Sequence, residues 1–131
     1  MNKLNLIGLT MATSLAAGNI FAAVTVMTNA PPLDLNPGDG FASFQKFTEG
    51  FAPPCTTCHQ LNDKLIGPSY KEVAKKRKGE EGAVNILAEK IMSGNVDGKM
   101  VYGDVVMPPN TMVKKETARK IAEWVLSLPT D

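Results

Sequence analysis

The sequence of 131 residues has few of the side chains that bind metals and almost no net charge. Its only cysteines are Cys55 and Cys58 and its only histidine is His59, so a zinc site that needs further Cys or His ligands is excluded. A formal charge of +1 gives no indication of nucleic-acid binding. Internal repeats and low-complexity tracts are absent, and an apolar fraction of 44% is ordinary for one small globular domain.

Long apolar runs are also absent, except near the N-terminus. Lys3 precedes a mostly apolar stretch, Leu4 to Ala17, and small residues follow up to Ala23. This order predicts a cleaved signal peptide over residues 1–23. A membrane anchor is the alternative, but it would need about 20 predominantly apolar residues, and this stretch is shorter and interrupted by polar ones. We therefore expect a periplasmic protein with no stable membrane insertion after cleavage.

Residues 24–38 are rich in proline and glycine. This composition suits an extended connector better than a helix or a central strand. We expect a linker that runs over the surface, followed by one folded domain over residues 39–131.

The first and last helices of that domain are predicted from their apolar faces. Asp39 is a suitable N-cap for a first helix that carries a row of phenylalanines and ends at Pro53-Pro54. The last helix has apolar residues at i, i+3, i+4 and i+7 from Ala118. We expect the two faces to pack together, because neither has another large apolar surface to cover. The pattern leaves open whether Phe44 or Phe47 contacts Trp124.

Two shorter helices are expected between them. Ser69 can cap a helix that ends near Gly79, and apolar spacing predicts another helix that ends at Gly94. The basic run Lys75–Lys78 is interpreted as a solvated helix C-terminus, with a docking patch as the alternative.

The chemistry of the sequence centres on Cys55-Thr56-Thr57-Cys58-His59. A Cys-x-x-Cys-His motif indicates attachment of a c-type haem: each thiol forms a thioether with one vinyl group, and the histidine ligates the iron. A redox dithiol is the alternative, but it would be expected within a βαβ pattern, which is not visible here. We therefore predict one covalently bound haem c, held by Cys55 and Cys58, with His59 as an iron ligand.

Met107 is the candidate for the second iron ligand. The sequence after the signal peptide and linker contains four methionines, namely Met92, Met100, Met107 and Met112. Met107 precedes Pro108-Pro109, whose fixed φ angles favour a stiff, non-helical segment that can hold a thioether at one distance from a metal. Met92 lies in a predicted helix, where packing explains it. His and Met form one of the few axial pairs that haem proteins use.

These motifs together resemble the small bacterial class I c-type cytochromes. The resemblance covers residues 39–128 and rests on Cys55–His59, Ile66-Gly67-Pro68, Met107-Pro108-Pro109-Asn110 and Ala122-Glu123-Trp124-Val125-Leu126. It implies an all-α cytochrome c fold, with four to five short helices around one haem and with the N- and C-terminal helices packed together. It also implies that one haem edge is exposed.

The resemblance also implies roles for residues around the two ligands. Pro68 would accept a hydrogen bond from His59, and the Asn110 amide would support the Met107 sulfur. Tyr102 stands where these cytochromes often have a tryptophan, so a hydrogen bond to a haem propionate would come from its phenol. Lys114 stands where a Ser or Thr helix cap is common.

The function that follows is that of a soluble one-electron carrier, not an enzyme. With both axial positions filled, the iron has no position for oxygen or substrate, and little rearrangement accompanies electron transfer. We expect a monomer that shuttles electrons between a donor and an acceptor protein of a respiratory chain. The alternatives are a haem-bearing electron-transfer subunit of an oxidoreductase complex and, less favoured, a ligand-binding haem protein.

Overall fold

The structure is a computed structural model that describes residues 34–95 and 105–131. Every regular element in these residues is helical, with four α-helices and one 3₁₀ turn, as the all-α prediction requires. The elements are α1 Phe41–Thr48, η1 Cys55–Thr57, α2 Tyr70–Arg77, α3 Ala83–Ser93 and α4 Lys115–Ser127. The predicted signal peptide, Met100 and Tyr102 lie outside the described residues.

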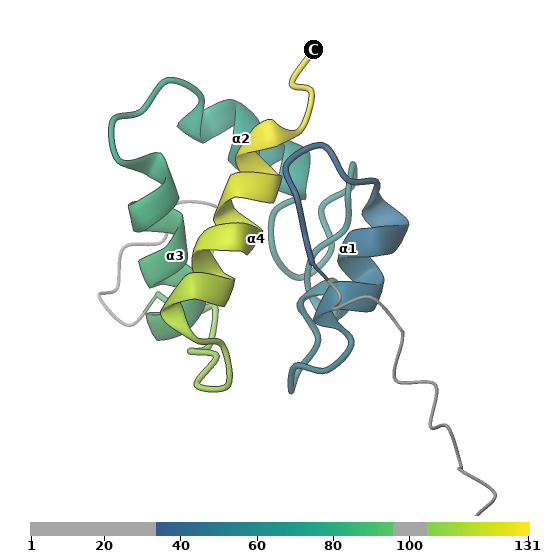
Figure 1. Ribbon diagram of the computed structural model, residues 1–131, viewed down its shortest axis with the longest axis vertical. Helices are drawn as coiled ribbons and strands as arrows, with labels where there is room; N and C mark the ends of the chain where they lie inside the picture. The colour runs from purple at the N-terminus through teal and green to yellow at the C-terminus, as the bar shows by residue number, and fades with distance from the viewer. Residues whose placement is uncertain (1–33, 96–104) are drawn as a thin grey trace, which may run out of the picture.

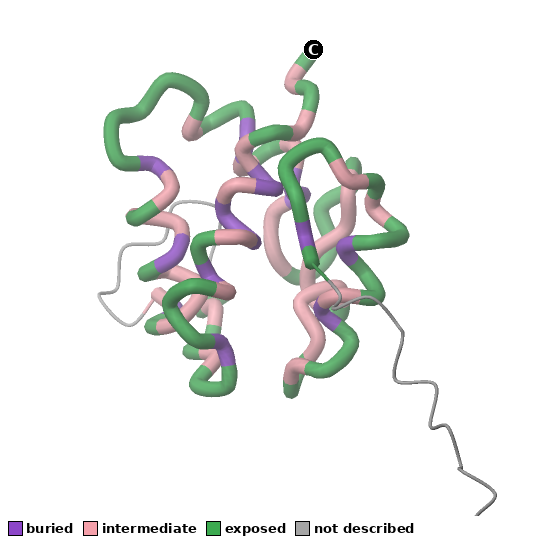
Figure 2. The backbone as a smooth tube through the Cα atoms, in the orientation of Figure 1, coloured by how far each residue is buried: buried purple, intermediate pink, exposed green. Residues whose placement is uncertain are grey.

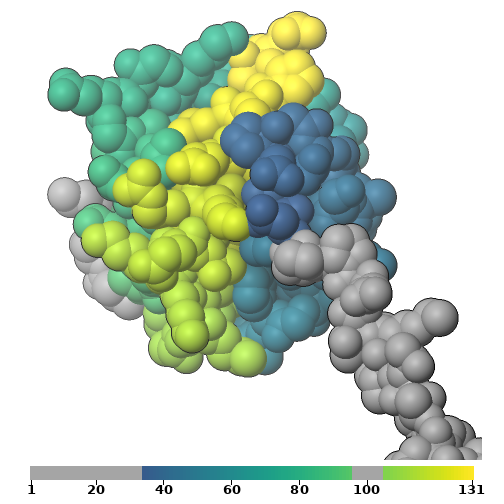
Figure 3. Space-filling model, in the orientation of Figure 1, coloured from purple at the N-terminus to yellow at the C-terminus, as the bar shows by residue number. Residues whose placement is uncertain are grey.

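Helix α4 is the central element of the fold (Figure 1). It packs most extensively against α3 and next against α2, and it meets α1 through aromatic side chains. The expected packing of the first and last helices is therefore present, but α3 is an additional partner that the sequence analysis did not anticipate. In the space-filling view, α4 lies in contact with α3 on one side and with the N-terminal described residues on the other (Figure 3).

The face of α4 that was expected to be buried is buried (Figure 2). Its buried residues are Ala118, Ile121, Ala122, Trp124 and Val125. Their spacing places them on one stripe of the helix, which faces the other elements. This confirms the apolar periodicity as the signal for α4.

An aromatic cluster joins α1, α2 and α4. Phe44 and Trp124 are fully buried and stacked, with ring centroids 4.0 Å apart and planes inclined at 18°. Tyr70 meets both rings edge-on, with centroid distances of 4.8 Å to Phe44 and 5.6 Å to Trp124. Of the two candidates, Phe44 therefore packs on Trp124, whereas Phe47 contacts Phe51 at a centroid distance of 6.1 Å.

The residues before α1 are fixed to α4. The indole Nε1 of Trp124 donates a hydrogen bond to the Asp39 carbonyl oxygen at 2.7 Å, and the Gly38 N–H donates to Ser127 Oγ at 3.0 Å. Leu35 is 2% exposed and belongs to the core. The stretch expected to be a surface linker therefore contributes a core residue at its described end.

The ends of α1 differ from the prediction. Gly40, not Asp39, is the N-cap, and the Asp39 carboxylate instead accepts a hydrogen bond from the Asn36 N–H at 2.8 Å. The helix ends at Thr48, before the expected end at Pro53-Pro54, because a turn begins at the next residue. The side chain that was expected to cap α1 thus stabilises the preceding turn.

The ends of α2 and α3 agree with the prediction. Ser69 caps α2, since its Oγ accepts a hydrogen bond from the Glu72 N–H at 3.1 Å. Gly94 follows the last residue of α3 in a positive-φ conformation. Across the described ranges, no helix is long and apolar enough to cross a membrane.

Candidate functional site

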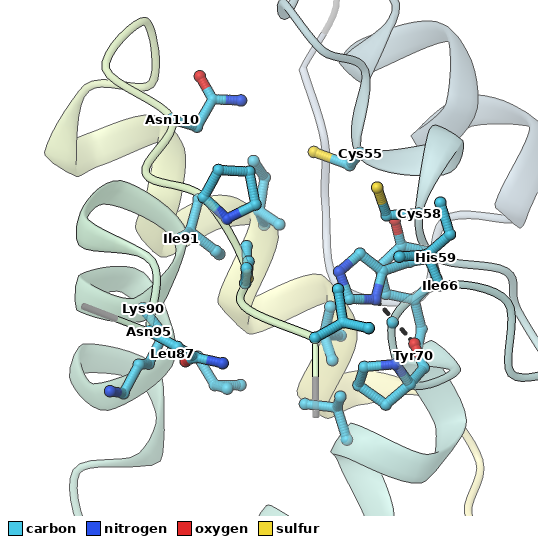
Figure 4. A pocket seen from close by; sticks show the side chains of 18 of the residues that line it. Cys55, Cys58, His59, Ile66, Tyr70, Leu87, Lys90, Ile91, Asn95 and Asn110 are labelled. Carbon is cyan, nitrogen blue, oxygen red and sulfur yellow. Dashed lines mark hydrogen bonds between the residues drawn. The ribbon is translucent and has the colours of Figure 1, made fainter. Parts of the chain in front are cut away.

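A cavity of about 550 Å³ lies between the segment after α1 and walls formed by α2, α3, α4 and the loop before α4. Figure 4 shows Cys55, Cys58 and His59 on one side and Leu87 and Ile91 of α3 on the other. Further aliphatic side chains that line it are Val73, Ile121 and Val125. The cavity therefore combines apolar walls with a few polar groups, as sites for cofactors commonly do.

The turn η1 presents both thiols to this cavity. Pro54 enters the turn with an extended backbone, and the Thr57 N–H donates to the Pro54 carbonyl at 3.0 Å. The N–H groups of Cys58 and His59 both donate to the Cys55 carbonyl, at 3.2 and 3.1 Å. This tight turn brings the two sulfur atoms and the imidazole to the same wall (Figure 4).

The Cys55 thiol does not have the lowered pKa of a reactive redox cysteine. Cys55 and Cys58 form no disulfide, and burial raises the pKa of the Cys55 thiol to about 11. The thiolate is the reactive form in disulfide exchange, and dithiol motifs that perform it lower the pKa of one cysteine. The environment of Cys55 acts in the opposite direction, which argues against that alternative.

The imidazole of His59 is oriented by the segment that follows it. Its Nδ1 donates a hydrogen bond to the Pro68 carbonyl oxygen at 2.7 Å, the contact expected from the sequence. Burial lowers the pKa of His59, while the hydrogen bond to Pro68 acts in the opposite direction. A neutral ring whose proton is on Nδ1 keeps the lone pair of Nε2 available for a metal.

Met107 lies on the loop before α4, at the edge of the cavity next to α3. The Asn95 N–H donates to the Met107 carbonyl at 3.0 Å, and the Asn110 N–H donates to the Ile91 carbonyl at 3.4 Å. The two prolines between Met107 and Asn110 have no N–H to donate. The segment is therefore attached to the end of α3 at both of its ends.

The other described methionines are not placed at the cavity. Among the methionines that the structure describes, Met107 alone lines it. Met112 is 57% exposed, and Met92 packs against the core from α3. Within the described residues, the cavity thus brings together the two thiols, His59 and the methionine selected from the sequence.

Asn110 also lines the cavity (Figure 4). Its Oδ1 accepts a hydrogen bond from the Met112 N–H at 3.3 Å. This contact fixes the orientation of the side chain and leaves the two N–H donors of the amide for another acceptor.

Three cationic residues that line the cavity, Lys64, Arg77 and Lys90, were missed by the sequence analysis. Arg77 lies on α2 and Lys90 on α3. Arg77 Nη1 donates to both carboxylate oxygens of Glu80, at 2.8 and 2.7 Å. For these two, helical spacing was the available signal, since Arg77 is four residues after Val73 and Lys90 is three residues after Leu87, both of which line the cavity.

The residues present fit a covalently attached haem. The apolar walls suit the ring, the two thiols suit its vinyl groups, and imidazole and thioether are an axial pair that haem proteins use. Arg77 and Lys90 offer positive charge for the two propionates. A cavity of about 550 Å³ also lies within the range of ordinary cofactor pockets.

Comparison with known proteins agrees with this fit. The family model described as cytochrome c matches residues 40–129. Cytochrome c-551 of Stutzerimonas stutzeri is 43% identical over 90 residues, which are 69% of this chain and 77% of that protein. Cytochrome c-552 of Hydrogenobacter thermophilus is 45% identical over 74 residues, which are 56% of this chain and 71% of that protein.

A solved structure shows the same fold. The crystal structure of wild-type Nitrosomonas europaea cytochrome c552 matches with a TM-score of 0.57 and 34% sequence identity, covering 67% of this chain and 99% of that chain. The arrangement of helices expected from the resemblance is thereby confirmed.

Proposed function

The chain belongs to the cytochrome c family as a class I monohaem c-type cytochrome, and on this premise we propose that it is a one-electron carrier whose haem iron is ligated by His59 and Met107. The observation that carries the proposal is that one cavity is lined by Cys55, Cys58, His59 and Met107. When bound, the haem supplies one-electron exchange between the ferric and ferrous states.

The attachment residues and His59 act as one unit in this proposal. Cys55 and Cys58 hold the haem as thioethers, and η1 keeps His59 directly beside them. The Pro68 carbonyl fixes the imidazole by accepting a hydrogen bond from Nδ1, at an N···O distance of 2.7 Å, which would leave Nε2 available to hold the iron. The ligand is thus oriented before any electron is exchanged.

Met107 supplies a neutral thioether from a segment with little freedom. Two prolines follow it, and hydrogen bonds to the end of α3 flank the segment. The amide of Asn110 supports the sulfur as a donor, because its Oδ1 is already engaged by the Met112 N–H. His59 and Met107 would together hold the iron and would leave no position on it for oxygen or a substrate, which supports an electron carrier and not an enzyme.

Arg77 and Lys90 hold the acidic edge of the haem in this proposal. A carboxylate next to either cation gains a charge-assisted hydrogen bond, which neutral donors provide less strongly. Arg77 also forms an ion pair with Glu80, with an Nη1–Oε2 distance of 2.7 Å. Tyr102, which lies outside the described residues, is proposed as a further donor to a propionate.

The rim of the cavity is the proposed docking surface for redox partners. Leu65, Ile66, Val105 and Val106 line the cavity and are each exposed by half or more. Exposed apolar side chains that cluster in this way mark interaction sites. A small apolar rim gives a short-lived contact, which a carrier between a donor and an acceptor requires.

We also propose that the carrier works as a periplasmic monomer in a respiratory chain. The support is the signal-peptide pattern over residues 1–23, with the linker over 24–38 and the haem domain over 39–131. Mass spectrometry of the exported protein should give a chain that begins after the pattern, carries one haem and elutes at the size of a monomer. A full-length chain in the membrane fraction would contradict the export proposal.

An absorption measurement on the haem-loaded protein tests the ligand assignment. We expect a reduced-minus-oxidised spectrum of c-type haem and, in the ferric protein, the weak near-infrared band of a sulfur–iron bond. Met107→Ala should abolish that band and allow carbon monoxide to bind the ferrous iron, while haem stays attached. Met112→Ala is the matched control and should leave the band unchanged. A Met107→Ala protein with an unchanged ferric spectrum would show that another group ligates the iron.

A further inference from the structure

The end of α3 lies unusually close to the backbone of the methionine loop. Gly94 follows α3 and is buried, and its N–H donates to the Lys90 carbonyl at 2.9 Å. A Cβ built on Gly94 would overlap the Met107 carbonyl oxygen and would lie 2.8 Å from both Pro108 C and Pro109 N. These are backbone atoms, which cannot rotate away as a flexible side chain would.

The backbone conformation of Gly94 imposes a second requirement. Its φ of 66° and ψ of −157° fall in a region that is essentially restricted to glycine. Any other residue would shift either the last turn of α3 or the segment that Gly94 contacts. That segment begins with Met107.

The loop has few other means of fixing its own position. Pro108 and Pro109 donate no hydrogen bonds, so the backbone contacts that hold the segment come from its two ends. Asn95 N donates to the Met107 carbonyl, and Asn110 N donates to the Ile91 carbonyl. Ile91 lies in the last turn of α3 and Asn95 directly follows its C-cap, and α3 packs extensively on α4.

We propose that Gly94 is a positioning residue for Met107: its lack of a side chain lets the methionine loop lie against the end of α3 and so sets the strength of the sulfur–iron bond. This inference rests on the proposed function, in which Met107 is the second axial ligand. A shift of the loop at the Met107 carbonyl would move the same residue whose sulfur would hold the iron. Helix α3, and not the loop alone, then controls access of other ligands to the iron.

The test compares Gly94→Ala with Gly82→Ala in the haem-loaded protein. Gly82 is the N-cap of the same helix and also has a positive φ, of 72°, but a Cβ there would meet no atom within 4 Å. Gly94→Ala should weaken the ferric sulfur–iron band and tighten binding of imidazole to the ferric iron by at least about tenfold, which corresponds to about 1.4 kcal/mol. Gly82→Ala should lower stability but leave both readouts unchanged.

Two results would overturn the proposal. One is a folded Gly94→Ala protein with the band and imidazole affinity of the wild type. The other is a Gly82→Ala protein that changes both readouts as much as Gly94→Ala does, because destabilisation of α3 would then be a sufficient cause.

A second measurement does not depend on the folding of a Gly94 variant. Coupling between two sites is reciprocal, so removal of the sulfur–iron bond by Met107→Ala should loosen the end of α3. Hydrogen exchange at the Asn95 amide, which donates to the Met107 carbonyl, should become faster, while exchange at the Ile86 amide in the first turn of α3 should not. Equal protection of Asn95 in both proteins would overturn the proposal.

Failure of this inference is distinguishable from failure of the proposed function. If Met107→Ala leaves the ferric band in place, the ligand assignment itself fails. If Met107→Ala abolishes the band and Gly94→Ala leaves it intact, only the role of Gly94 fails.

Discussion

Gly67 lies directly against the imidazole of His59. A Cβ built on Gly67 would lie 2.5 Å from His59 Cε1 and 2.9 Å from Nδ1, closer than real Cβ contacts allow. The carbonyl of the next residue, Pro68, accepts a hydrogen bond from Nδ1 of the same ring. The pair Gly67-Pro68 therefore fixes the ring by contact and by hydrogen bonding together.

Gly67→Ala should displace the imidazole and lengthen its hydrogen bond to Pro68. We expect a lower thermal midpoint and an altered ferric spectrum in the haem-loaded protein, since the added methyl group has no free space. Gly50→Ala is the control, because a Cβ at Gly50 would meet no atom within 4 Å. Identical spectra for Gly67→Ala and the wild type would contradict the close contact.

Phe44→Ala should be strongly destabilising. The ring is fully buried and stacked on Trp124, and truncation of a buried phenylalanine costs about 3–5 kcal/mol of the free energy of unfolding. Denaturant titration of the haem-loaded protein measures this loss. Phe47→Ala, at a partly exposed ring of the same helix, should cost clearly less, and equal losses would be inconsistent with the central place of Phe44 in the core.

Ser69→Ala should cost about 1 kcal/mol of stability, because it removes the side-chain oxygen that accepts from the Glu72 N–H at the start of α2. Ser43→Ala is the matched change at an exposed position within α1, where alanine has the higher helix propensity. It should be neutral or slightly stabilising in the same titration. A Ser69→Ala protein as stable as the wild type would show that the cap contributes nothing.

Lys120→Gln should have a small effect. Lys120 forms an ion pair with Asp34, but the two side chains are 44% and 51% exposed, and pairs of this kind contribute less than about 1 kcal/mol. The loss, measured against Asp34→Asn in a double-mutant cycle, should shrink further as salt is added. A large, salt-independent coupling energy would mean that the pair is more protected from solvent than its exposure indicates.

The sequence alone was sufficient to predict the role of a residue where that role depends on its immediate neighbours in the chain. Ser69 caps α2 by accepting from an N–H three residues along the chain, Gly94 ends α3 by its own conformation, and Cys55 to His59 form one tight turn. Each depends on contacts within a few positions along the chain. Pro68 is nine residues from His59, and this longer contact was predicted only because the resemblance implies it.

The sequence was insufficient to predict the position or the partner of a residue where these depend on contacts between distant segments. Asp39 has the side chain of a good N-cap, but its carboxylate bonds to Asn36 instead. Leu35 lies in a stretch rich in proline and glycine, and it is buried only because the chain before α1 crosses α4. In both cases the composition describes the local segment but does not indicate which other segment packs against it.

For the basic run Lys75–Lys78, charge along the sequence did not predict which residue faces the cavity. It was interpreted as a solvated helix end, and Lys75, Lys76 and Lys78 are indeed exposed. Arg77, within the same run, is turned toward the cavity and has a side chain only 16% exposed. The rotation of α2 about its axis turns Arg77 toward the cavity and the three lysines toward solvent. That rotation is set by the residues that α2 buries.

The burial of Trp124 gives the protein a single internal optical probe. It is the only tryptophan in the chain, and on the same helix Ile121, Ala122 and Val125 line the haem cavity. Haem absorbs at the wavelengths at which indole emits, so energy transfer should quench nearly all of the Trp124 fluorescence in the folded, haem-loaded protein. An increase in Trp124 fluorescence would then report the separation of α4 from the haem in real time, without any introduced label.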